Sequence, residues 1–164
     1  RREFENAYKK LKEKKPNLKS LCYLKPKDAE FIKSNLQNKE MRRALYVSAE
    51  QDRVNQAVKA IKKGSIKDLG ALILKTHDGL SKLYEVSTAE LDILVEEAMN
   101  MDGVMGVCMI GTGFGGGVLM FLKKTEVENV IENLYAKYKE KTRRDADVYI
   151  VKPSNGARIL PIEE

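Results

Sequence analysis

Five glycines fall within the seven residues from Gly111 to Gly117, in the run Gly-Thr-Gly-Phe-Gly-Gly-Gly. Glycine supplies no side chain for packing, so such a run indicates a backbone with positive φ angles or a close approach by another group. Successive backbone amides in such a loop form a concavity suited to phosphate oxygens. No Lys follows at the spacing of a P-loop, and the run is expected between two strands, which argues against a dinucleotide fingerprint as well. The residues alone leave a phosphate contact and a purely structural hairpin equally open.

His77 is the single histidine of the chain, so any histidine chemistry depends on it. It lies on the apolar stripe of an expected helix. This position favours a packed, hydrogen-bonded histidine that supports the turn Tyr84-Glu85-Val86-Ser87 over a catalytic one. Cys22 and Cys108 lie in apolar surroundings, and we expect small core residues rather than reactive thiols or zinc ligands.

Carboxylates and hydroxyls elsewhere give weaker candidates. Asp92 and Glu96 are spaced i, i+4, but further acidic residues nearby favour a solvated acidic face over a pair for acid–base catalysis. Ser87 is followed by Glu90 at the spacing of a capping box, so its expected role is to cap a helix. Neither Ser87 nor Ser81 has a histidine in a convincing triad relation.

The elements that must position the glycine run follow from hydrophobic periodicity. Helices are expected over residues 1–15, from Pro26, over 38–63 and 66–80, from Thr88, and over the segment from Val127 to Tyr138. Short runs of branched residues predict strands at 106–110, 118–122 and 147–151. A fourth strand is expected at 20–24 or at 156–160. This order predicts an α+β fold, a ferredoxin-like sandwich with helices over one sheet face and extra N-terminal helices.

Composition narrows the class of protein. The 164 residues are 43% hydrophobic and 33% charged, as in a soluble globular protein. No apolar run approaches the roughly 20 residues that span a bilayer, and no secretory signal is visible. With two cysteines and no metal-like spacing, reduced thiols and a cytoplasmic location are expected.

The basic charge lies in one part of the chain. Net charge is +6, but residues 1–63 carry 18 Lys and Arg against eight Asp and Glu, whereas residues 64–164 carry 12 against 16. The excess is Lys-rich, is spread along expected helices and has few aromatic residues interleaved. This pattern favours solvated helix faces over a nucleic-acid surface, and we expect neither a nucleic acid nor a membrane as partner.

Four segments resemble the galactokinases of the GHMP kinase family. The stretch Val-Met-Gly-Val-Cys-Met-Ile-Gly-Thr-Gly-Phe-Gly-Gly at residues 104–116 resembles the third conserved motif of that family. Residues 76–92 resemble the segment that precedes it, and the opening Arg1-Arg2-x-x-Glu and the closing 153–157 also match. The resemblance covers nearly the whole chain in order, so it is far more specific than the glycine run alone.

This resemblance implies the C-terminal part of a galactokinase, which transfers the γ-phosphate of ATP to the anomeric hydroxyl of galactose. Residues 1–25 would form an N-terminal helix and a connection to a missing upstream kinase domain, and 26–164 the GHMP-type C-terminal domain. The implied phosphate-binding residues are Gly111, Thr112, Gly113, Phe114, Gly115 and Gly116.

The catalytic residues, the sugar pocket and the main phosphate loop would lie upstream. This chain would then hold no catalytic residue and no metal ligand. ATP and magnesium would belong to the full-length parent, with neither bound tightly here, and the chain would be inactive alone. It would be able to self-associate through the surface that faces the missing domain.

The sequence also departs from the galactokinase pattern. Cys108 and Ile110 stand where that family usually has Arg and Thr. The loss of Arg removes a fixed cation with five donors. These departures keep a second interpretation open: a non-catalytic, galactokinase-like regulatory or protein-interaction module.

Overall fold

The computed structural model describes residues 2–152 and 154–157; Arg1, Pro153 and 158–164, which include three residues of the candidate strand 156–160, lie outside. The helices are α1 (Arg2–Lys14), α2 (Ala29–Asn35), α3 (Asn38–Lys62), α4 (Ile66–Gly79), α5 (Ala89–Met99) and α6 (Val127–Thr142). The strands are β1 (Val104–Ile110) and β2 (Gly117–Leu122). Short turns of 3-10 helix lie at Leu21–Tyr23, Pro26–Asp28 and Lys124–Glu126, and a π-helical turn at Leu80–Tyr84 follows α4.

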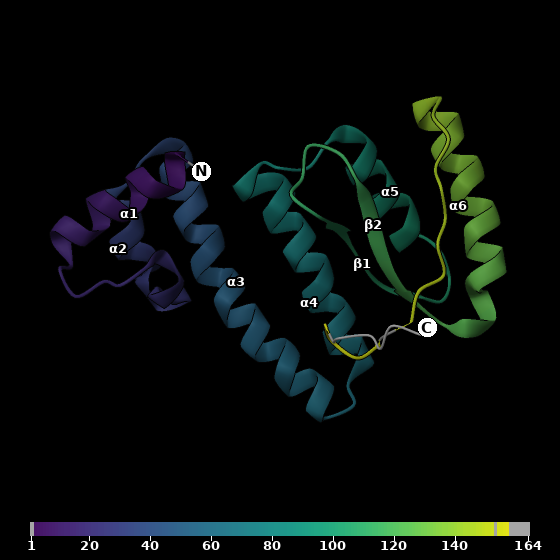
Figure 1. Cartoon of the computed structure of the whole chain (residues 1–164), viewed down its shortest axis with the longest axis horizontal. Helices are drawn as coiled ribbons and strands as arrows, with labels where there is room; N and C mark the ends of the chain where they lie inside the picture. The colour runs from purple at the N-terminus through teal and green to yellow at the C-terminus, as the bar shows by residue number, and fades with distance from the viewer. Residues whose placement is uncertain (1, 153, 158–164) are drawn as a thin grey trace, which may run out of the picture.

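Helix α3 lies between the N-terminal helices α1 and α2 on one side and α4 on the other (Figure 1), and the chain has two hydrophobic clusters. The N-terminal cluster joins α1, α2 and the start of α3. Its buried residues are Ala7, Leu11, Leu18, Leu21, Leu24, Ile32, Leu36 and Ala44. The second cluster lies between the helices and the sheet, and its buried residues are Val95, Ala98, Val107 and Leu134. Burial of these side chains supplies the main driving force for folding.

Strands β1 and β2 form an antiparallel hairpin in which Ile110 pairs with Gly117, so the six residues 111–116 form its loop. Helix α4 lies against β1 because two glycines face each other. A Cβ on Gly70 would lie 1.7 Å from the carbonyl oxygen of Met105, and one on Gly106 would lie 2.8 Å from the Cα of Gly70. This close contact fixes the hairpin relative to α4.

The structure confirms the α+β class with helices packed over the sheet, and it corrects the strand count. Residues 147–151 form no strand and lie exposed, with Tyr149 79% accessible. Branched and aromatic residues favour strands where one face is buried, and this segment has no such cover. Residues 20–24 contain a 3-10 turn instead of a strand, and Gly156 and Ala157 form no strand. The described residues therefore hold two strands of the expected four.

None of the helices in the described part of the chain combines the length and the apolar character needed to cross a membrane.

Candidate functional site

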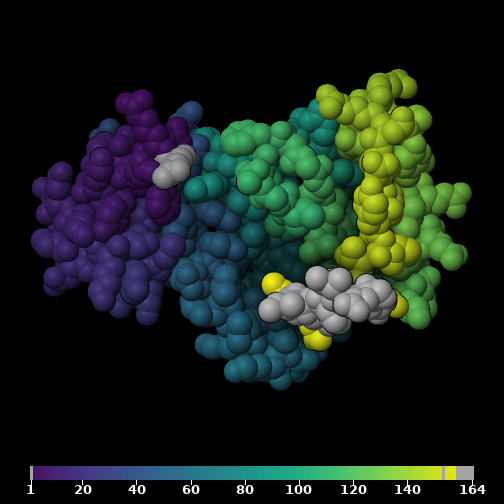
Figure 2. Space-filling view, viewed as in Figure 1, coloured from purple at the N-terminus to yellow at the C-terminus, as the bar shows by residue number. Residues whose placement is uncertain are grey.

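The loop at the tip of the hairpin has the backbone that its composition predicts. Gly111, Gly113, Gly115 and Gly116 have φ angles of +89°, +89°, +135° and +100°, and Phe114 has a φ of +61°. Residues with a Cβ avoid this region, so the glycines are required by conformation. The hairpin tip lies on the surface between the N-terminal helices and α6 (Figure 2), and Phe114 is 77% exposed.

The loop rests on Val86. The backbone N–H of Phe114 donates to the carbonyl oxygen of Val86 at 2.7 Å. A Cβ on Gly113 would lie 2.4 Å from the same oxygen, so only glycine fits there. Within the described residues, the amides of Thr112, Gly113, Gly115 and Gly116 have no hydrogen-bond partner. These backbone donors are therefore not used within the described part of the chain, and unpaired backbone donors are what an amide concavity offers to an anion.

The chain by itself does not enclose a nucleotide at this loop. The cavity beside Phe114 has a volume of about 120 Å³, smaller than the roughly 300–1,000 Å³ of typical ligand pockets. Its walls are Glu3, Phe4, Arg43, Tyr84, Glu85 and Val86. A ligand at the loop needs a further surface to cover it.

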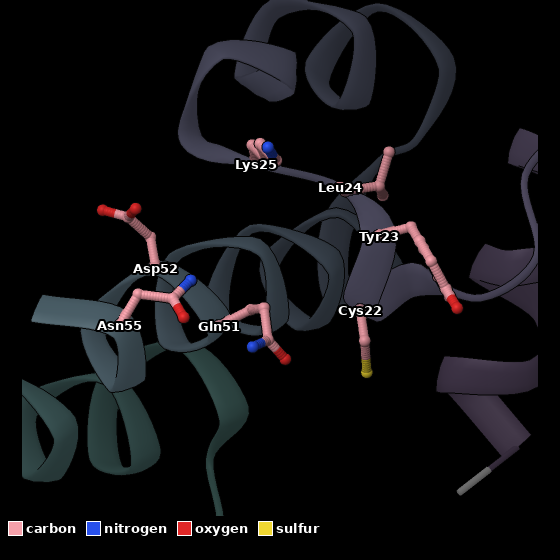
Figure 3. Close-up of a pocket in the computed structure, with 7 residues that line it drawn as sticks. All are labelled: Cys22, Tyr23, Leu24, Lys25, Gln51, Asp52 and Asn55. Atoms are coloured by element: carbon pink, nitrogen blue, oxygen red, sulfur yellow. The ribbon is translucent and has the colours of Figure 1, made fainter. Parts of the chain in front are cut away.

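A larger hollow of about 490 Å³ lies elsewhere, between the turn Leu21–Tyr23 and the middle of α3 (Figure 3). Its α3 residues are Gln51, Asp52 and Asn55, on the opposite face from Glu50, which accepts a hydrogen bond from Thr76 of α4. The hollow is thus separate from the glycine loop. Cys22 opens onto it and is exposed, so the expectation of a core cysteine was wrong there: the short 3-10 turn buries Leu21 instead.

His77 is a packed histidine, as its place on the apolar stripe predicts. Its side chain is 5% exposed, and its Nε2 lies 3.2 Å from Oδ1 of Asp92. Its Nδ1 accepts the backbone N–H of Met109 at 3.3 Å. Burial lowers the pKa of His77 below its ordinary value, and the Asp92 carboxylate opposes that shift. These contacts define a neutral imidazole that carries its proton on Nε2.

Asp92 has a structural role that the sequence did not reveal. Its carboxylate accepts hydrogen bonds from the hydroxyls of Ser87 at 2.6 Å and Ser81 at 2.9 Å, in addition to the contact with His77. The capping role expected for Ser87 was wrong, because Thr88 accepts the helical N–H that caps α5. The carboxylate lies between serine and histidine, so His77 cannot take a proton from Ser87 directly. This order differs from that of a nucleophilic triad.

The role of Arg43 was also not predicted from the sequence. Its guanidinium donates to the carboxylates of Glu3 at 3.1 Å and Glu85 at 2.8 Å and to the carbonyl of Leu83. Arg42 donates to the second oxygen of Glu85 at 2.8 Å. A signal was present: two adjacent arginines stand in a Lys-rich segment, and Arg is the residue preferred for buried, multiply bonded ion pairs.

Cys108 and Ile110, two positions that depart from the galactokinase pattern, lie in the second half of β1. Cys108 is half-buried, and burial raises the pKa of its thiol to about 11, so the thiol is inert at neutral pH. Ile110 is 49% exposed beside the loop. The described residues hold no group of three or more His, Cys, Asp or Glu arranged for a metal ion.

Comparison with known proteins defines the class first. The family described as "GHMP kinases C terminal" matches residues 57–140, just over half of the chain, and the chain belongs to this family. Its relatives are galactokinases. The galactokinase of Fusobacterium nucleatum is 37% identical over 154 residues, which are 93% of this chain and 40% of that protein. The galactokinase of Clostridium perfringens is 34% identical over 157 residues, 95% of this chain and 40% of that protein.

A solved structure agrees. Lactococcus lactis galactokinase, determined in complex with galactose, matches with a TM-score of 0.85 at 28% identity, over 90% of this chain and 38% of that one. The chain therefore spans about two fifths of the length of the galactokinases that it resembles. The resemblance read from the four sequence segments is confirmed.

Proposed function

We propose that this chain is the C-terminal part of a galactokinase and supplies the glycine loop that borders the phosphates of ATP. The observation that carries the proposal is the exposed loop of residues 111–116, with four amides that have no partner among the described residues. Phosphoryl transfer depends on positioning and on electrostatic stabilisation of the phosphate oxygens. Backbone donors held in a fixed loop provide both without a titratable group.

The remaining parts of the reaction belong to the segment that this chain does not contain. His77 is engaged on both ring nitrogens, and the carboxylates beside the loop, Glu3 and Glu85, are paired with Arg43, so none of these groups is free to act as a general base. No described metal-ligand cluster suits magnesium, which prefers oxygen ligands and phosphates. We therefore assign the sugar pocket, the base and the metal ligands to an upstream kinase domain. That domain, galactose and ATP are the partners proposed for this chain. A cytoplasmic location is part of the proposal, because both cysteines are free thiols.

The test is a chimeric protein in which this chain replaces the matching segment of a related galactokinase. The chain would replace the corresponding 40% of the Fusobacterium nucleatum galactokinase, giving what we call the joined protein. We expect galactose-dependent ADP formation by the joined protein and none by the chain alone. Activity of the chain alone would contradict the division of labour. A joined protein that folds and binds ATP and galactose but does not turn over would contradict the catalytic proposal.

That last outcome would favour a second function, a non-catalytic sensing or protein-interaction module. Cys108 and Ile110 motivate it, because neither supplies the cation or hydroxyl usual there in the galactokinase pattern. A matched variant of the joined protein, with Cys108→Arg and Ile110→Thr, separates the two. Recovery of turnover in that variant assigns the loss to these two positions.

A further inference from the structure

The glycine loop can present its amides only if the surface beneath it is fixed. That surface is the carbonyl of Val86, which accepts the N–H of Phe114 at 2.7 Å. Gly113 lies so close that an added Cβ would be 2.4 Å from the same oxygen. The position of the loop therefore depends on the position of Val86.

Val86 itself lies in an irregular segment. The π-helical turn Leu80–Tyr84 ends at Glu85, whose φ of 56° and ψ of 50° place it in the left-handed region. A residue with a Cβ pays a conformational cost there and persists only where the surroundings hold it. Two backbone bonds, from the N–H groups of Glu85 and Val86 to the carbonyl of Leu80, tie the segment to the preceding turn. Side chains must supply the rest.

Two polar networks reach this segment from opposite ends. On the N-terminal side, Arg43 donates to the Leu83 carbonyl and, together with Arg42, to both oxygens of Glu85. The side chain of Arg43 is 9% exposed, and its Nε is occupied by Glu3. Every nitrogen of this guanidinium has a partner, so Arg43 is not a cation kept for a ligand.

On the C-terminal side, Asp92 accepts the Ser87 hydroxyl at 2.6 Å and contacts His77 at 3.2 Å. His77 in turn accepts the N–H of Met109, two residues before the loop begins. Asp92 thus links the residue after Val86 to the strand that leads into the loop. The Asp92 carboxylate therefore connects Ser87, next to the residue on which the loop rests, with His77 and, through it, with Met109 of β1.

We propose that Glu85 and Asp92 are positioning residues for the glycine loop: Arg43 and Arg42 hold Val86 through Glu85, and Ser87 and His77 hold it through Asp92. Asp92 is not among the residues that line the cavity beside Phe114, whereas Glu85 is one of its walls and is held there by both arginines. The inference deepens the proposed function, since the loop that is positioned is the one assigned to the nucleotide. It is tested without nucleotide, so the two can fail separately.

The experiment measures amide hydrogen exchange by NMR in the 164-residue chain. Glu85→Gln weakens the first network, and Ser87→Ala removes a donor from the second. We expect exchange of the Phe114 N–H to rise about tenfold in each, as for the loss of one hydrogen bond to a charged group. Ser87→Thr keeps the hydroxyl and is expected to restore protection.

Glu30→Gln is the matched control. It removes the carboxylate of an exposed ion pair with Lys33 within α2, outside both networks, and should leave Phe114 unchanged. Hydrogen exchange at amides of α6, such as that of Leu134, shows whether a variant has lowered the stability of the whole protein. Faster exchange at Phe114 with unchanged exchange in α6 supports the proposal. Equal exchange at Phe114 in all variants overturns it, as does a rise shared by α6.

Discussion

Gly113→Ala tests the contact between the loop and Val86. The added Cβ would lie 2.4 Å from the Val86 carbonyl oxygen and 2.7 Å from its Cβ, both well inside contact distance. Because backbone cannot move aside as a flexible side chain can, either Val86 or the loop must shift. That shift breaks the hydrogen bond from the Phe114 N–H.

Gly111→Ala is the matched comparison. Gly111 has the same φ of +89°, but nothing lies within 4 Å of its added Cβ. It therefore carries only the conformational cost, roughly 1–2 kcal/mol. We expect Gly113→Ala to cost about 2–3 kcal/mol more, from overpacking and the lost hydrogen bond. For a chain of this size that difference corresponds to about 4–12 °C in Tm.

The assay is thermal unfolding followed by circular dichroism, with urea unfolding as a check on the free energy. The two variants differ only in what the new methyl group meets. Equal Tm values for Gly111→Ala and Gly113→Ala would refute the idea that the loop is seated on Val86.

Four further outcomes are expected. Gly70→Ala would stabilise an ordinary helix, but here the new Cβ lies 1.7 Å from the Met105 carbonyl oxygen. Urea unfolding should therefore show that the free energy of unfolding falls by about 3 kcal/mol or more. An unchanged free energy would contradict the contact between α4 and β1. Burial lowers the pKa of His77, so the unfolded state binds more protons than the folded state once the pH drops below about 6.5. The free energy of unfolding should therefore decrease as the pH decreases. In His77→Gln the part of this decrease that is due to His77 should vanish. A thiol reagent at pH 7 should modify the exposed Cys22 quickly and Cys108, whose pKa is raised to about 11, slowly; equal rates would argue against burial of Cys108. The exposed apolar side chains of α3 and β2 should make the isolated chain self-associate with increasing concentration in sedimentation, and a monomer that binds no hydrophobic dye would count against this.

Local patterns in the sequence were enough for most of the elements. The expected helix at 38–63 is observed as Asn38–Lys62, and the one at 66–80 as Ile66–Gly79. In both, apolar spacing is a local signal that the fold does not override, and Gly64, with a φ of +66°, follows the end of the first. The two strands of the hairpin and the positive φ angles of its glycines are likewise determined by nearby residues.

Interactions between distant residues were harder to predict. The segment 147–151 has the composition of a strand, but composition does not state whether an edge is available to pair with it. Ser87 has the spacing of a cap, yet Thr88 takes that role and Ser87 bonds to Asp92. The contact between Arg43 and Glu85 joins residues 42 positions apart. Periodicity carries no information about such a pair.

The sequence predicted which residues form the loop, but not most of the contacts that hold the loop in place. The glycine run identified the loop, and the resemblance identified the family. The sequence assigned His77 to the support of the turn Tyr84-Glu85-Val86-Ser87. It did not predict the link between His77 and Asp92 or the pairing of Arg43 with Glu85, because these contacts join residues far apart in the sequence. Their role follows only from three-dimensional contacts.

The most direct test of the central claim is glycine-selective ¹⁵N labelling of the joined protein, followed by titration with a non-hydrolysable ATP analogue and magnesium. Gly113, Gly115 and Gly116 have amides without partners among the described residues, so their signals should shift most as the analogue saturates. Gly64, at the end of α3, should not move. Saturable nucleotide binding that leaves the loop glycines unshifted would contradict the account.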